Sequence, residues 1–195
     1  MDCIKERRSI RKYISKPVDK KLINEILSAA VLAPSAKNRQ PWKFIVYSAG
    51  SKDELLNAME KGLIKTKAEL SNMPNSEYLL SDAFNTLRIM REAPTVIMVL
   101  NTNGSSPFAD IDTFARITEI CDSLSIGAAI ENMLLKATEL GLGTLWIANT
   151  CYAYNELADF IGTTDLLIGA VALGYADEAP APRPRKSLDE TAEYR

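Results

Sequence analysis

A short basic segment near the N-terminus gathers side chains that could hold an anion. The segment RRSIRKY, at positions 7–13, places Arg7, Arg8 and Arg11 around the hydroxyl of Ser9. Arginine presents a planar fork of donors that matches phosphate geometry, and a serine hydroxyl adds a further donor. The alternative is an ordinary basic helix face exposed to solvent, and this stretch alone favours that alternative.

Two further segments carry polar side chains that could recognise a ligand. In the loop APSAKNRQPW, at 33–42, prolines stiffen both ends, and Ser35, Asn38 and Gln40 can each pair with a polar ligand edge. The commoner interpretation of such a loop is a helix-to-strand connector with a tryptophan in the core. In PRPR, at 182–185, both arginines share one side of an extended chain, because alternate residues face the same way. A frayed basic tail is the alternative there.

The charge of the chain is unevenly distributed. Residues 1–43 contain 11 Lys and Arg against 4 Asp and Glu, whereas the other 152 residues contain 12 against 21, and the net charge of the chain is −2. A basic end on an acidic body indicates a local anion site. It argues against a nucleic-acid partner, whose binding surface usually carries a broader positive field.

Composition excludes several classes of function. The 195 residues include no histidine, which rules out His-based triads, His metal sites and His acid–base steps. Cys3, Cys121 and Cys151 lie far apart without CxxC spacing, so we expect no disulfide framework, no metal site and a cytoplasmic location. No apolar run approaches the roughly 20 residues that span a bilayer, and the N-terminus lacks the apolar stretch of a signal peptide, so we expect no membrane partner.

Helical and strand patterns alternate along the chain. Apolar residues at helical spacing predict an amphipathic helix over 19–33, with Asp19 as its N-cap. A longer helix is predicted over 114–140, and its segment SIGAAIENMLLKATELG is apolar on most of its circumference. A short helix is predicted with Asn155 as its cap and Gly162 as its stop. Residues 52–61 are expected to be helical, 62–91 to be helix with loops, and 101–112 to be a loop. Buried strands are predicted at 43–48, 93–101, 143–149 and 166–176.

This alternation predicts a layered α/β or α+β sandwich in a single domain. No glycine-rich dinucleotide or phosphate-loop fingerprint follows a strand, so a Rossmann or P-loop interpretation loses its main support. The proline-rich, charged sequence from about residue 177 predicts an extended tail rather than a packed element.

In this order and spacing the segments resemble the nitroreductase family of flavoproteins. The resemblance rests on RRSIRKY, APSAKNRQPWKFIVY, IGAAIENMLLKATELGLGTLWI and RPRK, and it extends from about residue 4 to about residue 188. It implies an α+β domain over 1–195 with a mixed central β-sheet flanked by helices. It also implies a homodimer in which long helices pack across the twofold axis, the tail reaches over the partner, and one FMN per subunit lies in a cleft at the interface.

The resemblance further implies an activity. Hydride passes from NADH or NADPH to FMN, the oxidised nicotinamide leaves, and a nitroaromatic, quinone or other small electrophile is then reduced in the same pocket, which is a ping-pong sequence. The cofactor carries this chemistry, so no catalytic nucleophile or base is expected from the protein. Two alternatives stay open: a flavin-fragmenting or dehalogenating relative of the same fold, and a non-catalytic flavin-binding protein.

The resemblance also assigns roles to individual positions. Positions from both chain ends are expected to hold the phosphate and ribityl chain: Arg7, Arg8, Ser9, Arg183 and Arg185. A loop from the partner subunit is expected against the flavin: Pro34, Ser35, Ala36 and Asn38. The strand segment near flavin N5 is matched by Trp146, Ile147, Ala148 and Asn149. Ala148 or Asn149 is the candidate for the N–H that bonds N5.

Four further expectations complete the assignment. Arg11 corresponds to a cation near the pyrimidine edge of the flavin, where two-electron reduction leaves negative charge that a fixed cation stabilises. Asn85 is an additional candidate contact. Gln40 and Trp42 are expected to brace the 34–38 loop rather than to touch FMN. Residues 62–115 correspond to the lid over the substrate side and show no recognisable specificity motif.

Overall fold

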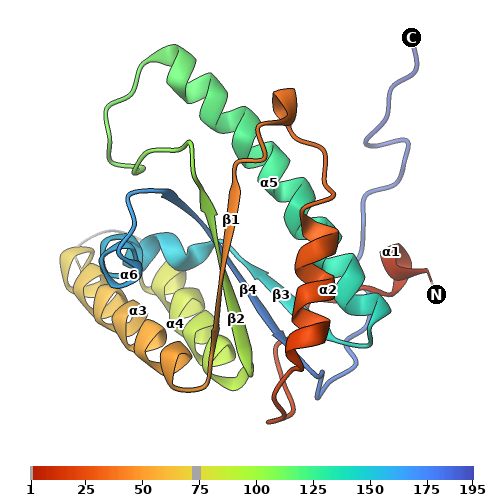
Figure 1. Ribbon diagram of the computed structural model, residues 1–195, viewed down its shortest axis with the longest axis horizontal. Coiled ribbons are helices and arrows are strands. Elements are labelled where there is room, and N and C mark those ends of the chain that lie inside the picture. Colours follow the sequence, from red (N-terminus) through yellow and green to blue (C-terminus); the bar gives the residue numbers. More distant parts are fainter. Residues whose placement is uncertain (1, 72–75) are drawn as a thin grey trace.

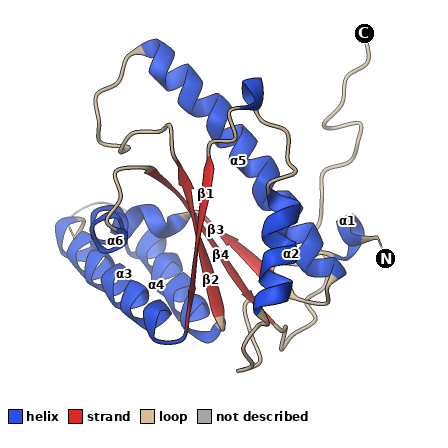
Figure 2. Cartoon of the chain, in the orientation of Figure 1, coloured by secondary structure: helices blue, strands red, loops and turns tan. Residues whose placement is uncertain are grey.

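A four-stranded sheet forms the middle layer of the fold (Figure 2). In the computed structural model, which describes residues 2–71 and 76–195, the strands lie in the order β1 (Trp42–Ser48), β2 (Thr95–Asn101), β4 (Leu166–Gly174) and β3 (Gly143–Ile147). All three pairings of these strands are antiparallel. The sheet of the described residues is therefore antiparallel and not mixed as expected, since the one parallel pairing is an isolated bridge between Ser9 and Thr144 outside the four strands. The α+β class is confirmed.

Two groups of helices cover the two faces of the sheet (Figure 1). One face carries α3 (Ala49–Glu69), α4 (Ser76–Glu92) and α6 (Tyr154–Ile161), and the other carries α2 (Lys20–Ala30) and α5 (Thr113–Glu139). Each face has its own apolar core, and every side chain of β2 is buried between them. This two-sided burial explains the continuous apolar run in that part of the sequence.

Local signals in the sequence explain most helix ends. Asp19 caps α2 as predicted, and its carboxylate accepts a hydrogen bond from the backbone N–H of Lys21. Gly162 ends α6 in the left-handed conformation, also as predicted. The predicted cap Asn155 is wrong, because the short 3₁₀ helix η2 (Asn149–Ala153) leads directly into α6 and Ala153 occupies the cap position.

Two predicted elements differ in length from those observed. Helix α3 is longer than the predicted 52–61, because buried residues such as Leu63 continue its packed face. The strand predicted over 143–149 stops at Ile147, where the chain turns into η2. The prediction of helix with loops over 62–91 is met by the end of α3 and by α4, while positions 72–75 lie outside the described residues.

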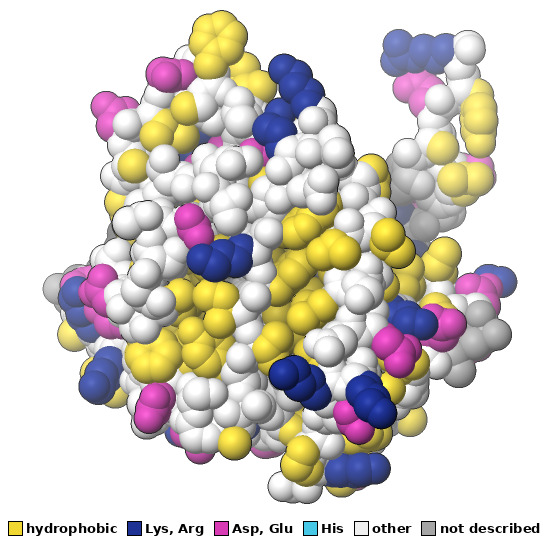
Figure 3. Space-filling view, viewed as in Figure 1, with side chains coloured by type: hydrophobic (Ala, Val, Ile, Leu, Met, Phe, Trp, Pro, Cys, Tyr) yellow, Lys and Arg dark blue, Asp and Glu magenta, His cyan; other side chains and the backbone are white. Residues whose placement is uncertain are grey.

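The ends of the chain run beside one another on one side of the sheet. The short helix α1 (Cys3–Glu6) begins the N-terminal segment, and the C-terminal tail leaves the body after an isolated bridge between Tyr13 and Ala176. The backbone N–H of Asp177 donates to the carbonyl of Lys12 at 3.0 Å, which fixes the base of the tail. Beyond it, residues 178–195 contain no helix or strand, and the end of the tail stands away from the body (Figure 3).

The first half of α5 projects beyond the sheet (Figure 1). Its large apolar side chains there are exposed: Phe114, Ile117, Ile120 and Leu124. Its second half is buried against α2 and the sheet, as residues such as Ile130 and Met133 show. Within the part of the chain that the structure describes, no helix has both the length and the apolar character needed to cross a bilayer.

Candidate functional site

The two ends of the chain enclose a cavity of about 280 Å³, here named the basic cavity. Its N-terminal wall consists of Ile4, Lys5, Arg7, Arg8, Ser9 and Arg11, and its tail wall of Pro180, Ala181, Pro182, Arg183 and Arg185. No acidic residue lines it. The structure therefore brings together the five arginines and the serine that the sequence singled out at opposite ends, although their contact with a phosphate stays a prediction.

Most of the positive charge in the basic cavity is not neutralised by carboxylates. Among the described residues, Arg7 is the one arginine of this cavity with a carboxylate within 4 Å of its guanidinium, since its Nε lies 3.6 Å from Glu131. Arg8 donates from Nη1 to backbone carbonyls of the preceding residues, and Arg185 does the same to carbonyls of the tail. A set of cations held by carbonyls rather than by acids keeps its charge available to an anion.

Pairing with β3 positions the N-terminal wall of the basic cavity. The backbone N–H of Ile10 donates to the carbonyl of Thr144 at 2.9 Å, which places Ser9 and Arg11 next to the strand. The backbone N–H of Arg11 donates to the carboxylate of Glu178, at the base of the tail. Sequence reasoning did not identify Glu178, which connects the two walls of the cavity.

A second cavity, of about 270 Å³, adjoins the first and is here named the β3 cavity. One wall comes from α4: Asp82, Asn85, Thr86 and Ile89. The other wall comes from the end of β3: Leu145, Trp146, Ile147, Ala148 and Asn149. Arg11 lines both cavities, so they meet at this residue. The structure thus gathers Asn85 and the four predicted residues of the 146–149 segment around one space.

Side-chain hydrogen bonds fix the turn at the end of β3 against α4. The Nδ2 of Asn149 donates to the Oδ2 of Asp82 at 3.1 Å and to the Oγ1 of Thr86 at 2.9 Å. Because both acceptors belong to α4, the nitrogen end of the Asn149 amide faces that helix. Trp146, on the same strand, is 43% exposed, whereas its neighbours Leu145 and Ile147 are buried. The β3 cavity therefore combines an aromatic surface with a firmly held backbone turn.

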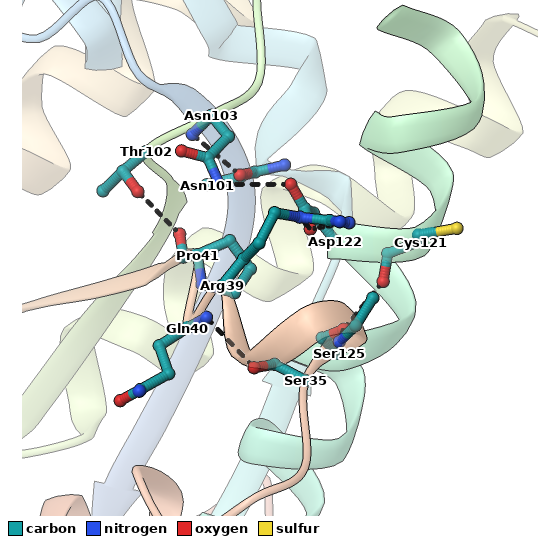
Figure 4. A network of polar contacts seen from close by, with 11 residues as sticks. Ser35, Arg39, Gln40, Pro41, Asn101, Thr102, Asn103, Cys121, Asp122 and Ser125 are labelled. Carbon is teal, nitrogen blue, oxygen red and sulfur yellow. Dashed lines mark hydrogen bonds and ion pairs between the residues drawn. The ribbon is translucent and has the colours of Figure 1, made fainter. Parts of the chain in front are cut away.

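The 34–41 loop lines neither cavity in this chain. Pro34, Ser35, Ala36 and Asn38 lie around the short 3₁₀ helix η1 (Ala36–Asn38), which packs beside α5 (Figure 4). The structure therefore does not bring these four predicted residues to the other candidates within one chain. Their assignment to a partner subunit's site stays a prediction.

A buried ion pair holds this loop against α5 (Figure 4). Arg39 contacts one oxygen of Asp122 through Nε at 2.8 Å and Nη2 at 2.7 Å, and the Asp122 side chain is fully buried. The other oxygen of Asp122 accepts from the Nδ2 of Asn103 at 3.2 Å. The sequence analysis missed Arg39 and Asp122. The available signal was the carboxylate of Asp122 close to the start of the most apolar part of the predicted helix.

The backbone of the loop is held in an unusual conformation. Lys37, Asn38 and Gln40 have φ values of 54°, 53° and 47°, a region that residues other than glycine rarely adopt. The backbone N–H of Gln40 donates to the Oγ of Ser35 at 3.0 Å, and its side-chain Nε2 donates to the Oδ1 of Asn38 at 3.2 Å. Gln40 thus contacts the loop as expected. Backbone strain of this kind persists only where surrounding contacts enforce it, and it is concentrated at functional sites.

Comparison with known proteins places the chain in a family. The family model described as "Nitroreductase family" matches residues 4–175. The chain belongs to the nitroreductase family. It is 29% identical over 190 residues to YfhC of Bacillus subtilis (strain 168), whose name places it among the NAD(P)H nitroreductases. That alignment covers 96% of this chain and 89% of the relative.

Solved structures share the nitroreductase fold. A nitroreductase-like family protein from Bacillus cereus superposes with a TM-score of 0.76 at 26% identity, over 99% of this chain and 94% of that one. The FMN-dependent nitroreductase NfnB from Mycobacterium smegmatis, whose structure is a complex with NADPH, superposes with a TM-score of 0.72 at 19% identity. It matches over 99% of this chain and 96% of that one.

Proposed function

We propose that this nitroreductase is an FMN-dependent oxidoreductase that uses NADH or NADPH to reduce small electrophiles such as nitroaromatics and quinones. The observation that carries the proposal is the position of Arg11, which lines both the basic cavity and the β3 cavity. A single elongated ligand can therefore lie with an anionic end among the arginines and a flat ring against β3. Family membership, and the cofactors named for NfnB, support the same assignment.

The residues present fit FMN. Arg7, Arg8, Ser9, Arg183 and Arg185 offer charged and hydroxyl donors suited to a phosphate. Arg11 would hold a fixed positive charge beside the pyrimidine edge of the ring, and the turn at Ala148 and Asn149 would present a backbone N–H toward N5. When bound, FMN supplies the hydride chemistry that links the nicotinamide donor to the acceptor. The protein's contribution is to bind, orient and fix charge.

A homodimer is part of the proposal. The loop that carries Asn38 is strained and firmly held, yet it lines no cavity of its own chain. The projecting half of α5 exposes a stripe of apolar side chains that includes Phe114, Ile117 and Leu124, which is typical of a surface covered by another subunit. We propose that a second copy covers this stripe and places its 34–38 loop against the ring. A cytoplasmic location stays a prediction, consistent with three free cysteines.

Flavin binding and reduction test the proposed function. Purified protein incubated with FMN should be yellow, its flavin absorbance should bleach on addition of NADH or NADPH without oxygen, and a quinone or nitroaromatic should restore the colour. Parallel lines in initial-rate plots at several acceptor concentrations would support the ping-pong order. Intact FMN recovered after aerobic turnover would exclude a flavin-fragmenting enzyme. A colourless protein that binds no added FMN would refute the proposal.

Substitutions in the tail test the shared phosphate site. Because each charged hydrogen bond contributes about 1.5–3 kcal/mol, the double substitution Arg183→Gln and Arg185→Gln should weaken FMN binding by roughly 100-fold or more. Arg195→Gln is the matched control, since this tail arginine lies outside the basic cavity and pairs with Glu193. Quenching of FMN fluorescence measures both affinities. Equal affinities would show that the tail does not hold the phosphate.

A further inference from the structure

The charged residues that line the β3 cavity are Arg11, from the segment that pairs with β3, and Asp82, from α4. Arg11 stands where the β3 cavity meets the basic cavity, whereas Asp82 projects from α4 toward the turn at the end of β3. The space between them therefore has a positive side and a negative side. Arg11, on the positive side, is assigned to the proposed binding of FMN. Asp82, on the negative side, has no role in that proposal.

The carboxylate of Asp82 is both held in place and unneutralised. Its Oδ2 accepts a hydrogen bond from the Nδ2 of Asn149, whose second amide hydrogen goes to Thr86. No Lys or Arg of the described chain lies within 4 Å of it, in contrast to Glu92 at the C-terminal end of α4, which pairs with Arg88. A fixed negative charge therefore lies at the edge of the β3 cavity, and no cation of the described chain is in direct contact with it.

We propose that Asp82 is a specificity-determining residue that makes the acceptor site select by charge, disfavouring anionic acceptors and favouring neutral and cationic ones. This inference rests on the proposed function. The turn at Ala148 and Asn149 is the part of the cavity assigned to flavin N5, where electrons leave for the acceptor. Because Asn149 is bonded to Asp82, the carboxylate lies next to the place that an acceptor must occupy.

Coulomb's law gives the size of the expected effect. For unit charges about 7 Å apart and an effective dielectric constant of about 40–80, the interaction changes a rate constant about three- to sevenfold. Because the sign reverses between anionic and cationic acceptors, their ratio should change by about the square of that factor, roughly ten- to fiftyfold. The effect should shrink at 0.5 M salt, because the Debye length there is shorter than about 7 Å.

The experiment uses the holoprotein and three para-substituted nitrobenzenes that differ in charge: 4-nitrobenzoate, 4-nitrobenzamide and (4-nitrobenzyl)trimethylammonium. Asp82→Asn keeps an oxygen that can accept from Asn149 but removes the charge. It should raise kcat/KM for the anion, and lower it for the cation, by about three- to sevenfold relative to the amide at low salt. Glu54→Gln is the matched control, because it removes an exposed charge on α3 that lines neither cavity and should leave these ratios unchanged.

The outcomes separate this inference from the proposed function. Ratios that stay within twofold of the unsubstituted enzyme, with the amide still reduced, would overturn charge selection alone. Failure of the unsubstituted protein to reduce even the amide would refute the proposed function, and this inference with it. If the Asp82→Asn protein loses FMN, a salt titration of the unsubstituted holoprotein tests the inference instead. Added salt should raise kcat/KM for the anion relative to the amide. If this ratio does not rise, the inference is overturned.

Discussion

Replacing Arg39 by methionine tests whether the ion pair with Asp122 holds the 34–41 loop. Methionine preserves much of the length of the side chain but removes the charge. Asp122 is fully buried, so the change would leave a carboxylate away from water with one remaining side-chain donor, the Nδ2 of Asn103. Breaking one side of a buried pair costs about 3–5 kcal/mol, because the partner's charge is left uncompensated. We expect that loss in the free energy of unfolding.

A double-mutant cycle determines how much of this loss comes from the stranded charge. Asp122→Asn alone should cost less, about 1–3 kcal/mol, because the Arg39 side chain is 26% exposed and its guanidinium can reach water. The double substitution removes both charges and should be more stable than Arg39→Met alone. The strained backbone at Lys37 and Gln40 should also relax in each variant, because the ion pair is lost and the loop keeps only the hydrogen bond from the backbone N–H of Ala36 to the Oγ of Ser125 on α5.

The assay is urea unfolding followed by circular dichroism at one fixed protein concentration, because the unfolding midpoint of the proposed dimer would depend on concentration. Amide hydrogen exchange over 35–41 reports the loop separately. Arg88→Met is the matched control, since Arg88 forms an exposed pair with Glu92 and should cost less than about 1 kcal/mol. A loss below about 1 kcal/mol for Arg39→Met, or a double variant no more stable than it, would refute the reasoning.

Three further substitutions test the packing of the body. Burial raises the pKa of Tyr13 far above its usual 10.0, so the folded chain keeps a proton that the unfolded chain releases above pH 10. Stability should therefore fall with rising pH there, and urea midpoints at pH 9–11 should fall less steeply for Tyr13→Phe. Gly169→Ala would bring a Cβ within 2.3 Å of the carbonyl oxygen of Ile147, so thermal unfolding should show a lower Tm and disturbed β3–β4 pairing. Lys52→Met removes two hydrogen bonds from Nζ to carbonyls at the end of α4, at 2.8 and 2.7 Å, and should cost about 1–3 kcal/mol in urea unfolding.

Local patterns predicted the elements of this fold well. Apolar periodicity located α2 and α5, runs of β-branched residues located the strands, and Asp19 and Gly162 marked helix ends as their chemistry requires. The cap predicted at Asn155 failed because a 3₁₀ helix precedes α6, and a sequence pattern does not distinguish a new helix from a continuation.

The site was only partly predictable, because its pairings are distant in sequence. Arg39 and Asp122 are 83 positions apart, and Asn149 and Asp82 are 67 apart. Such contacts form only once the strands have taken their order in the sheet. The spacing of residues within a short segment does not predict that order. The meeting of the two chain ends was foreseen from clustered arginines and from family resemblance together. Neither the charge pattern nor the motif alone distinguished that cavity from a solvated basic surface.

One wall of the basic cavity is the C-terminal tail, which has little regular structure of its own. Binding of an anion in the cavity and docking of the tail are therefore thermodynamically linked. By thermodynamic reciprocity, docking of residues 180–185 strengthens anion binding by the same free energy by which a bound anion stabilises the docked tail. The peptide bond after Arg185 is a trypsin site, and ligand should shield it. A preparation stripped of its cofactor would then be cut at that bond faster than the loaded protein, so the rate of trypsin cleavage would report how firmly residues 180–185 are docked.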